Sequence, residues 1–384
     1  MEADFNSTRL TYMKTQVRWN DILKKNLIDP RLYYSEPFAS SGSTLRDTTD
    51  KSINTSMSIK SYAICLNKED STQAGRYLVF LMNALKQKGI NVIPLYDNDT
   101  NINLSNIQYI IIGSRIPSTD EQLFMKNQNI QLIYVFATNP MVDDVERFAY
   151  NTTIPVERMD FVRSCNQIWL TNPNKQHQSY LKALYRLPIS IIPNLWTNIY
   201  SSNETIYTPK SPSEQLEIVL LDSNTTFNTS CWKQLVTCEQ LYLQNQQLIN
   251  KVYLFNTPDT NKSSMDMIGS LTFKQQGKMR IFKSLPIKDI VSFFLQSKLN
   301  VVFLTNQIFD DLSYDYYDVL YAGFPLVHSS KTLKDANIGR YYDSLDIQSA
   351  IQQLQVKDYD VQTNTANNRA YLSKLIITDT TFLN

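Results

Sequence analysis

The stretch that decides the fold reads DDLSYDYYDVLYAGFPLVH and spans residues 310–328. Its apolar spacing predicts a helix over 314–322, a Gly-X-Pro turn and an apolar strand over 325–328. Asp310 and Asp318 stand eight residues apart, one ahead of the helix and one within it. Carboxylates pair well with the vicinal hydroxyls of a sugar or a ribose, and a helix N-terminus offers amides to phosphate. The stretch fits a site for a ligand with hydroxyl and phosphate groups, and it fits an ordinary connection with solvated aspartates equally well.

The same alternation of apolar runs and amphipathic segments extends in both directions from this stretch. Upstream, the pattern predicts strands at 62–66, 90–95, 109–112, 131–136, 167–170 and 189–192, and helices at 76–88, 142–150 and 174–185. Further along the chain it predicts strands at 216–221, 251–255, 300–304 and 325–328, helices at 231–247, 287–295 and 314–322, and a largely helical segment over 347–375. Such alternation indicates parallel strands with crossover helices, which is a doubly wound α/β sheet.

A polar, proline-containing break over 193–212 interrupts this series. We therefore predict three parts: an N-terminal arm and linker over 1–58, an N-terminal Rossmann-like domain over 59–200 and a C-terminal Rossmann-like domain over 213–384. The fold class is thus α/β, with two doubly wound domains. Ligands of open α/β sheets bind at the carboxyl ends of the strands, so we expect a cleft between the sheet edges.

The N-terminal arm differs in composition from the rest of the chain. Residues 13–28 form a predicted amphipathic helix that would dock through Ile22, Leu23 and Leu27. The segment 35–57 is rich in Ser, Thr and Asp and is predicted to be an extended connector. The arm could pack on its own domain or contact a protein partner.

Composition excludes several classes of function. The net charge is +1, and no basic aromatic patch is visible, so nucleic-acid binding is not expected. The eight glycines are too dispersed for a GxGxxG or P-loop motif, and the two histidines provide little material for a metal site. We expect no cofactor and no metal. The four cysteines form no CxxC pair, and the sequence shows neither a long apolar run nor a signal peptide. We therefore expect a cytoplasmic protein without a membrane span.

Several short segments occur in a characteristic order. They are 144–147 (DVER), 182–188 (KALYRLP), 193–196 (PNLW), 238–239 (CE), 317–328 and 333–336 (LKDA). Together they resemble an uncharacterised glycosyltransferase-like family with a GT-B fold, found in bacteria and large DNA viruses. The resemblance covers about residues 60–375. It implies a GT-B-like arrangement in which 59–200 is the acceptor-side domain and 213–384 is the nucleotide-sugar-side domain. It also implies a nucleotide diphosphate sugar as the donor substrate.

The chain departs from the family pattern at three places. Residues 309–311 (FDD) replace a Glu-Asn-Pro run, Thr229 stands where a lysine could face a diphosphate, and Ala137 replaces a glycine. Each charge-assisted hydrogen bond to a diphosphate stabilises binding by about 1.5–3 kcal/mol, so the missing lysine matters for activity.

Two hypotheses follow, and the order of the motifs favours the first. It is an enzyme that transfers a hexose from a nucleotide diphosphate sugar to a hydroxyl of a glycan or protein. The expected donor-binding residues are Asp222, Asn224, Asp310, Asp318, His328, Lys334 and Arg340. The expected acceptor-side residues are Gln73 and Asn139, and the expected catalytic bases are Asp144 and Glu146.

The second hypothesis is a catalytically degenerate GT-B protein with a structural or binding role. Richness in Asn, Gln and Tyr, scarcity of Gly and the N-terminal arm are consistent with a viral source. The protein would then act in the host cytoplasm or in the virus particle, since a fold alone does not fix a function.

Overall fold

The computed structural model describes fourteen segments of the chain, and residues 58–384 form one compact unit. The described residues are 61–66, 72–96, 104–114, 116–149, 156–198, 206–208, 215–222, 228–256, 262–283, 285–297, 299–307, 311, 313–355 and 359–376. The predicted helix over 13–28 and connector over 35–57 lie outside them, as do Asn224 and Asp310.

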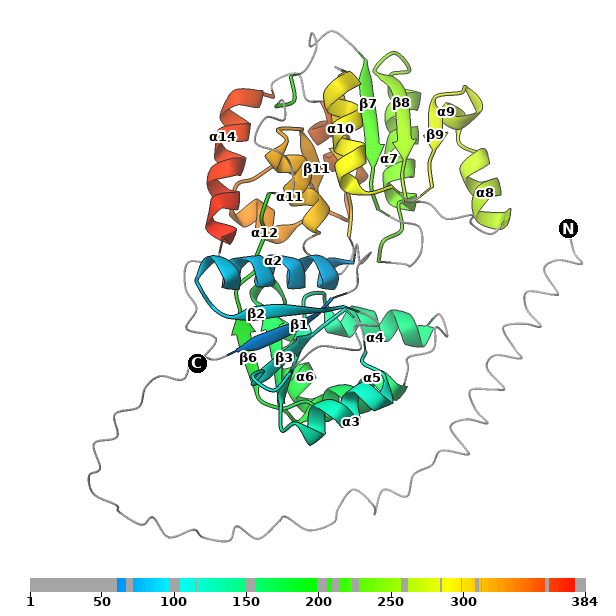
Figure 1. Ribbon diagram of the computed structural model, residues 1–384. Coiled ribbons are helices and arrows are strands. Elements are labelled where there is room, and N and C mark those ends of the chain that lie inside the picture. Colours follow the sequence, from blue (N-terminus) through cyan, green and yellow to red (C-terminus); the bar gives the residue numbers. More distant parts are fainter. Residues whose placement is uncertain are drawn as a thin grey trace, which may run out of the picture. The chain divides into compact units, whose positions relative to one another are not determined.

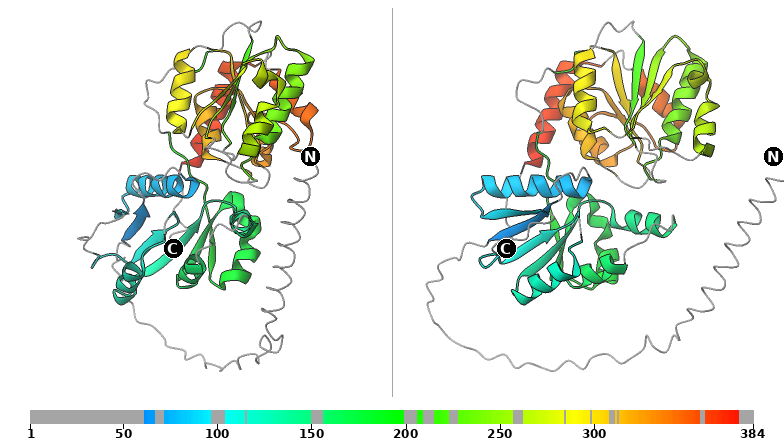
Figure 2. Two further views of the ribbon diagram at one scale, coloured as in Figure 1. Left: turned by 90° about the vertical axis from the view of Figure 1, so that its right-hand side faces the viewer. Right: turned by 45° about the vertical axis from the view of Figure 1, so that its right-hand side comes forward.

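The first sheet has six parallel strands in the order β2-β1-β3-β4-β5-β6, and helices cover both of its faces (Figures 1 and 2). Its strands are β1 (Tyr62–Leu66), β2 (Val92–Tyr96), β3 (Tyr109–Ile112), β4 (Gln131–Phe136), β5 (Gln167–Thr171) and β6 (Ile189–Ile192). Its helices are α2 (Gln73–Gln87), α3 (Thr119–Asn127), α4 (Pro140–Ala149), α5 (Val156–Arg163), the 3-10 helix η2 (Asn172–His177) and α6 (Gln178–Tyr185).

The second sheet also has six parallel strands, in the order β12-β11-β10-β7-β8-β9. Its strands are β7 (Leu216–Leu220), β8 (Ile249–Leu254), β9 (Met279–Ile281), β10 (Val301–Leu304), β11 (Leu326–His328) and β12 (Arg340–Tyr341). The helices are α7 (Trp232–Gln244), α8 (Lys262–Gly269), α9 (Thr272–Gln275), α10 (Ile287–Ser297), α11 (Tyr314–Tyr321), α12 (Lys331–Asp335), α13 (Ile347–Leu354), α14 (Val361–Leu372) and the 3-10 helix η4 (Ser373–Leu375).

Strand periodicity explains how each sheet separates two hydrophobic cores. On β1, Tyr62 and Ile64 join the core beneath α2, while Ala63 and Cys65 join the core on the opposite face. Successive side chains of a strand point to opposite faces, so both faces of a buried parallel strand must be apolar. The α2-side core continues into the second sheet through residues such as Val219. One continuous hydrophobic core therefore joins the two halves of the compact unit.

The strand order of each sheet reverses at one point. In the second sheet the reversal lies between β7 and β10, and in the first it lies between β1 and β3. Loops leave the carboxyl ends of these strands in opposite directions, which opens a crevice there and makes it the usual ligand site of a doubly wound sheet. The predicted α/β class with two doubly wound sheets is confirmed, and the sheets change between Ile192 and Leu216.

Sequence patterns missed several short elements, among them α3, α5 and β9. Helix α3 buries only one side chain, Met125, so it carries no apolar periodicity. It begins instead with a capping box in which Ser118 and Glu121 bond to each other's backbone amides. Across the described residues, no helix is both long enough and apolar enough to cross a membrane.

We expect Gly323→Ala to destabilise the fold by at least about 2 kcal/mol in denaturant unfolding. Gly323 has a φ of +85°, and an added Cβ would lie 2.6 Å from the Thr365 Oγ1 atom on α14. Gly89→Ala introduces the strained φ without a contact, and should lose only about 1 kcal/mol. Gly269→Ala, which has neither, should lose nothing. Equal losses at all three positions would contradict this account.

Candidate functional site

A pocket lies where loops from the two sheets meet. It encloses about 370 Å³ when the open solvent at its mouth is counted. Every residue that lines it follows the carboxyl end of β1, β4, β5, β6 or β10. The lining residues are Gln73, Ala137, Thr138, Pro173, Asn174, Asn194, Asp311, Ser313, Tyr314 and Tyr317. Polar side chains from both sheets therefore converge where α/β proteins bind ligands.

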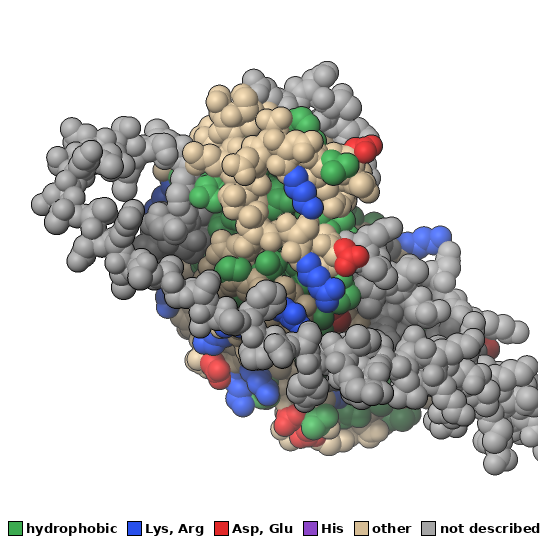
Figure 3. All heavy atoms as spheres, turned by 90° about the horizontal axis from the view of Figure 1, so that it is seen from below, with side chains coloured by type: hydrophobic (Ala, Val, Ile, Leu, Met, Phe, Trp, Pro, Cys, Tyr) green, Lys and Arg blue, Asp and Glu red, His purple; other side chains and the backbone are tan. Residues whose placement is uncertain are grey.

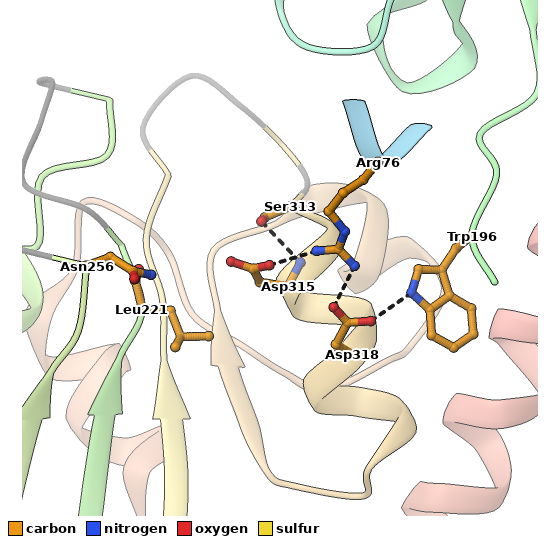
Figure 4. Close-up of polar contacts among 7 residues, drawn as sticks. All are labelled: Arg76, Trp196, Leu221, Asn256, Ser313, Asp315 and Asp318. Atoms are coloured by element: carbon orange, nitrogen blue, oxygen red, sulfur yellow. Dashed lines mark hydrogen bonds and ion pairs between the residues drawn. The ribbon is translucent and has the colours of Figure 1, made fainter. Parts of the chain in front are cut away.

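Beside this pocket, Arg76 joins the first helix of one sheet to a helix of the other. Its guanidinium donates to Asp315 Oδ1 at 2.8 Å and to Asp318 Oδ2 at 2.6 Å, and Trp196 Nε1 donates to Asp318 Oδ1 at 3.0 Å (Figure 4). Arg76 lies on α2, Asp315 and Asp318 lie on α11, and Trp196 lies on the segment after β6. We call this arrangement the Arg76 clamp. Both oxygens of the Asp318 carboxylate are occupied by it.

Local sequence explains how the two helices present these groups. Helix α2 begins where the Thr72 side chain accepts from the Gly75 amide, and it buries Tyr77, Leu78 and Leu81 toward the core. Helix α11 begins where the Ser313 side chain accepts from the Asp315 amide. Each helix start therefore fixes the clamp residues within its first turns.

The Arg76–Asp318 pair of the clamp is buried, whereas the Asp315 side chain is 31% exposed. The Asp318 side chain is fully buried, and the Arg76 side chain is 14% exposed. Burial raises the pKa of Asp318 to about 7, against the opposing effect of Arg76. Burial alone would lower the pKa of Arg76, but Asp318 and Asp315 outweigh it and raise that pKa above its usual value. The Arg76 guanidinium also lies 5.3 Å from the centre of the Tyr314 ring, a cation–π distance.

Asp222 marks the point where the strand order of the second sheet reverses. It follows β7, and its Oδ2 accepts from the Asn306 amide at 2.9 Å and from Gln234 Nε2 at 2.6 Å. Asn306 follows β10, and Tyr342 donates to the Thr305 carbonyl beside it at 2.9 Å. Burial raises the pKa of Asp222 to about 7. This predicted donor-side residue therefore ties together the two loops that flank the crevice.

The other described donor-side residues gather around β11 and β12. His328 is fully buried; its Nε2 pairs with the Ile338 carbonyl at 2.8 Å, and its Nδ1 accepts from the Ser330 amide at 3.2 Å. Both ring nitrogens are thus engaged with backbone, and burial lowers the His328 pKa to about 4. The Lys334 ammonium lies 4.2 Å from the centre of the Tyr341 ring. Arg340 donates to the Gln355 carbonyl at 3.5 Å.

Of the predicted acceptor-side and catalytic residues, Gln73 lines the pocket and the other three do not. Asn139 begins α4, where its Oδ1 accepts from the Met141 and Val142 amides. On the same helix, Asp144 Oδ2 accepts from the Tyr180 hydroxyl at 2.8 Å. Glu146 Oε1 accepts from the Asn228 amide at 2.7 Å, which forms a second link from the first half to the loop before α7.

Sequence reasoning missed most of the residues that make the pocket and the clamp. Asn194 donates to the Tyr317 hydroxyl at 2.8 Å and accepts from the Tyr314 hydroxyl at 3.3 Å. Asp311 accepts from the Lys331 amide at 2.5 Å and the Thr332 amide at 2.9 Å, so it caps α12. The sequence shows that Arg76 lies in a predicted amphipathic helix. Charged residues in such helices usually face solvent, so the sequence did not indicate that Arg76 is buried and paired.

The surface and the described side chains give no sign of two other kinds of site. Within the described segments, no group of three or more His, Cys, Asp or Glu side chains could hold a metal ion. On the face shown in Figure 3, the described basic and acidic side chains are interspersed with hydrophobic and uncharged ones. That face shows no continuous basic stripe among its described atoms, in contrast to the pattern of a nucleic-acid interface.

We expect Arg76→Leu to lower the free energy of unfolding at pH 8 by about 3–5 kcal/mol, because the buried Asp318 carboxyl loses its ionic partner and must be protonated at a cost or stay charged at a larger one. Arg76→Leu combined with Asp318→Asn should lose less than Arg76→Leu alone. The asparagine carries no charge, and its Oδ1 still accepts from Trp196. Denaturant unfolding of both variants measures the difference. A double variant less stable than the single one would show that the carboxylate is not stabilised by Arg76.

Asp222→Asn should change how stability depends on pH. The folded-state pKa of Asp222 is raised, so its contribution is present below about pH 4 and is lost as the pH rises through about 7. Relative to Asp222→Asn, the unmodified protein should lose up to about 1.4 kcal/mol per pH unit across this window. The His328 contribution has the opposite sign and cancels in the difference. A pH-independent difference between the two proteins in urea titrations would refute the assignment.

Comparison with known proteins agrees with this architecture. Sucrose-phosphate synthase from Thermosynechococcus elongatus has 14% sequence identity and a TM-score of 0.54, over 83% of this chain and 95% of that one. An α-glucosyltransferase solved with UDP and a 13-mer DNA has 10% identity and a TM-score of 0.53, over 82% and 94%. The UDP-forming α,α-trehalose-phosphate synthase from Burkholderia vietnamiensis has 9% identity and a TM-score of 0.52, over 82% and 95%.

These structural similarities show the fold, which is that of the GT-B glycosyltransferases. The sequence matches no curated protein. Residues 79–383 match the family described as "Protein of unknown function (DUF2827)". The chain belongs to this family, and its fold is a GT-B-like pair of doubly wound sheets.

Proposed function

We propose that this protein is a glycosyltransferase that moves a hexose from a nucleotide diphosphate sugar to a hydroxyl group of a glycan or protein acceptor. The observation that carries the proposal is the pocket lined from both sheets at the carboxyl ends of their strands. Donor and acceptor must meet in such a place, because transfer needs both reacting groups held together in one geometry. The reaction requires no cofactor besides the donor.

The donor nucleotide is proposed to bind at the crevice between β7 and β10. Asp222 ties the loops after these strands together, and a ligand at this crevice would meet backbone amides from both. Asn224 and Asp310 belong to the proposed donor site by their position in sequence. Lys334 and Arg340 are the proposed cations for the diphosphate, since charged donors bind phosphate more strongly than neutral ones.

Asp318 is the proposed partner of the ribose hydroxyls, and the clamp sets a condition on this role. Arg76 and Trp196 occupy both carboxylate oxygens. A ribose hydroxyl must therefore replace one of them, and Arg76 is the partner that belongs to the opposite sheet. Donor binding at Asp318 would be linked to release of the clamp. His328 is proposed to support the site by fixing the turn between β11 and α12.

The general base is proposed to be Asp144 or Glu146, on α4. Glu146 already reaches the second half through the Asn228 amide. In either case the carboxylate would have to leave its present partner to reach the acceptor hydroxyl, and catalytic contacts often tighten only when substrate is bound.

A catalytically degenerate protein with a structural or binding role is the second candidate. The occupied carboxylate of Asp318 and the engaged ring of His328 favour it, because both groups serve the fold in the unliganded protein. This candidate predicts that no nucleotide diphosphate sugar binds.

Calorimetry with a panel of nucleotide diphosphate sugars tests the proposal. One of them should bind, and Asp318→Asn should weaken its binding about ten- to a hundredfold, which corresponds to about 1–3 kcal/mol. Asp315→Asn is the matched control, because it removes the other acid of the clamp and leaves the proposed ribose partner intact. Equal weakening in both variants would assign the effect to the clamp alone. If no member of the panel binds to the folded protein, the transferase proposal is wrong. The second candidate, a catalytically degenerate protein, then remains.

A further inference from the structure

We propose that the Arg76 clamp is a latch that closes the pocket, and that a ligand can enter only when the start of α2 moves away from α11. Such a latch acts on any ligand larger than water, so it goes beyond the proposed transferase and does not depend on it. Three observations support it: the small room in the pocket, the change of contacts along α2 and the chemistry of the clamp itself.

The first observation is that the pocket has little internal space. Without the open solvent at its mouth, it has room for about one water molecule, whereas sites for small organic ligands measure about 300–1,000 Å³. Its walls come from both halves of the compact unit. Gln73 and Thr138 belong to the first half, and Ser313 and Tyr314 belong to the second. Moving one wall away from the other would therefore make room for a ligand.

The second observation is that α2 meets the other half with a polar end and an apolar part. Gln73, Arg76 and Phe80 lie along one face of the helix, because they follow one another at steps of three and four residues. Gln73 lines the pocket and Arg76 forms the clamp. One turn further, the Phe80 ring packs edge-on against the Tyr314 ring, with 5.3 Å between their centres. The start of α2 can therefore move while Phe80 stays in the continuous hydrophobic core.

The third observation is that the clamp can exchange its partners for water, which the apolar contact cannot. The Arg76 and Asp315 side chains are 14% and 31% exposed, so water already reaches the edge of the clamp. Asp318 is fully buried, and its charge would be costly without either Arg76 or water. The clamp therefore favours the closed position while it is intact. Once Arg76 leaves, water must follow it to Asp318, and the same movement opens the pocket beside it.

The reactivity of a thiol placed in the pocket tests the latch on the full chain. Thr138→Cys puts this thiol at a lining position, after the end of β4. In one protein it is combined with Arg76→Leu and Asp318→Asn, which together remove the ion pair. In the matched control it is combined with Arg163→Leu, which removes an exposed pair with Asp160 in the same half. Methyl methanethiolsulfonate should modify the thiol at least about tenfold faster without the clamp than in the control, because the rate follows the fraction of molecules with an open pocket.

Arg76→Lys, with Asp318 unchanged, should give an intermediate rate, because lysine keeps the charge but lacks the planar fork that bonds two carboxylates. The four native cysteines are buried and report on the fold in the same experiment. They should stay unmodified in every protein. Equal rates at the pocket position with and without the clamp would overturn the inference. Modification of the native cysteines in step with the pocket thiol would also overturn it, because the whole fold would then have loosened.

Discussion

The Arg76 guanidinium bonds to two carboxylates that lie 239 and 242 residues further along the chain. This contact fixes α2, the first helix of one sheet, against α11 of the other. It lies at the side of a continuous hydrophobic core that also spans both halves. A buried ion pair adds little net stability, but its geometry is demanding, and loss of one partner is severe. We therefore expect that removing Arg76 alone destabilises the protein far more than replacing the whole ion pair does.

The same contact governs the candidate site. By pairing with Asp318, Arg76 holds α11 where Tyr314 and Tyr317 can line the pocket. It also neutralises the acidic residues of α11, which would otherwise repel one another in a dry environment. The group that assembles the pocket is thus the group that occupies the proposed ribose partner. One side chain therefore couples the position of α11 beside the pocket to the access of any ligand to Asp318.

Two further contacts fit this arrangement. Glu146 links α4 to the Asn228 amide, and Asn194 links the segment after β6 to Tyr317. Each joins a side chain of the first half to the second half, close to a strand end. Polar links of this kind are more easily exchanged for ligand or water than an apolar core is, because hydrogen bonds to other polar groups can replace them. The protein combines a fixed apolar joint with exchangeable polar links around its pocket.

By itself, the sequence determined the α/β class, the two sheets and most of the strands. These features depend on local periodicity, which can be read from a short stretch of sequence. The apolar run of β1 is an example. It also placed Gln73 and Asp222 at strand ends, because the order of elements implies where loops gather. Tertiary structure alone decided that Asp318 pairs with Arg76 and that His328 uses both ring nitrogens for backbone. Such pairings join residues that are remote in sequence, and no local pattern records which distant partner a buried charge will meet.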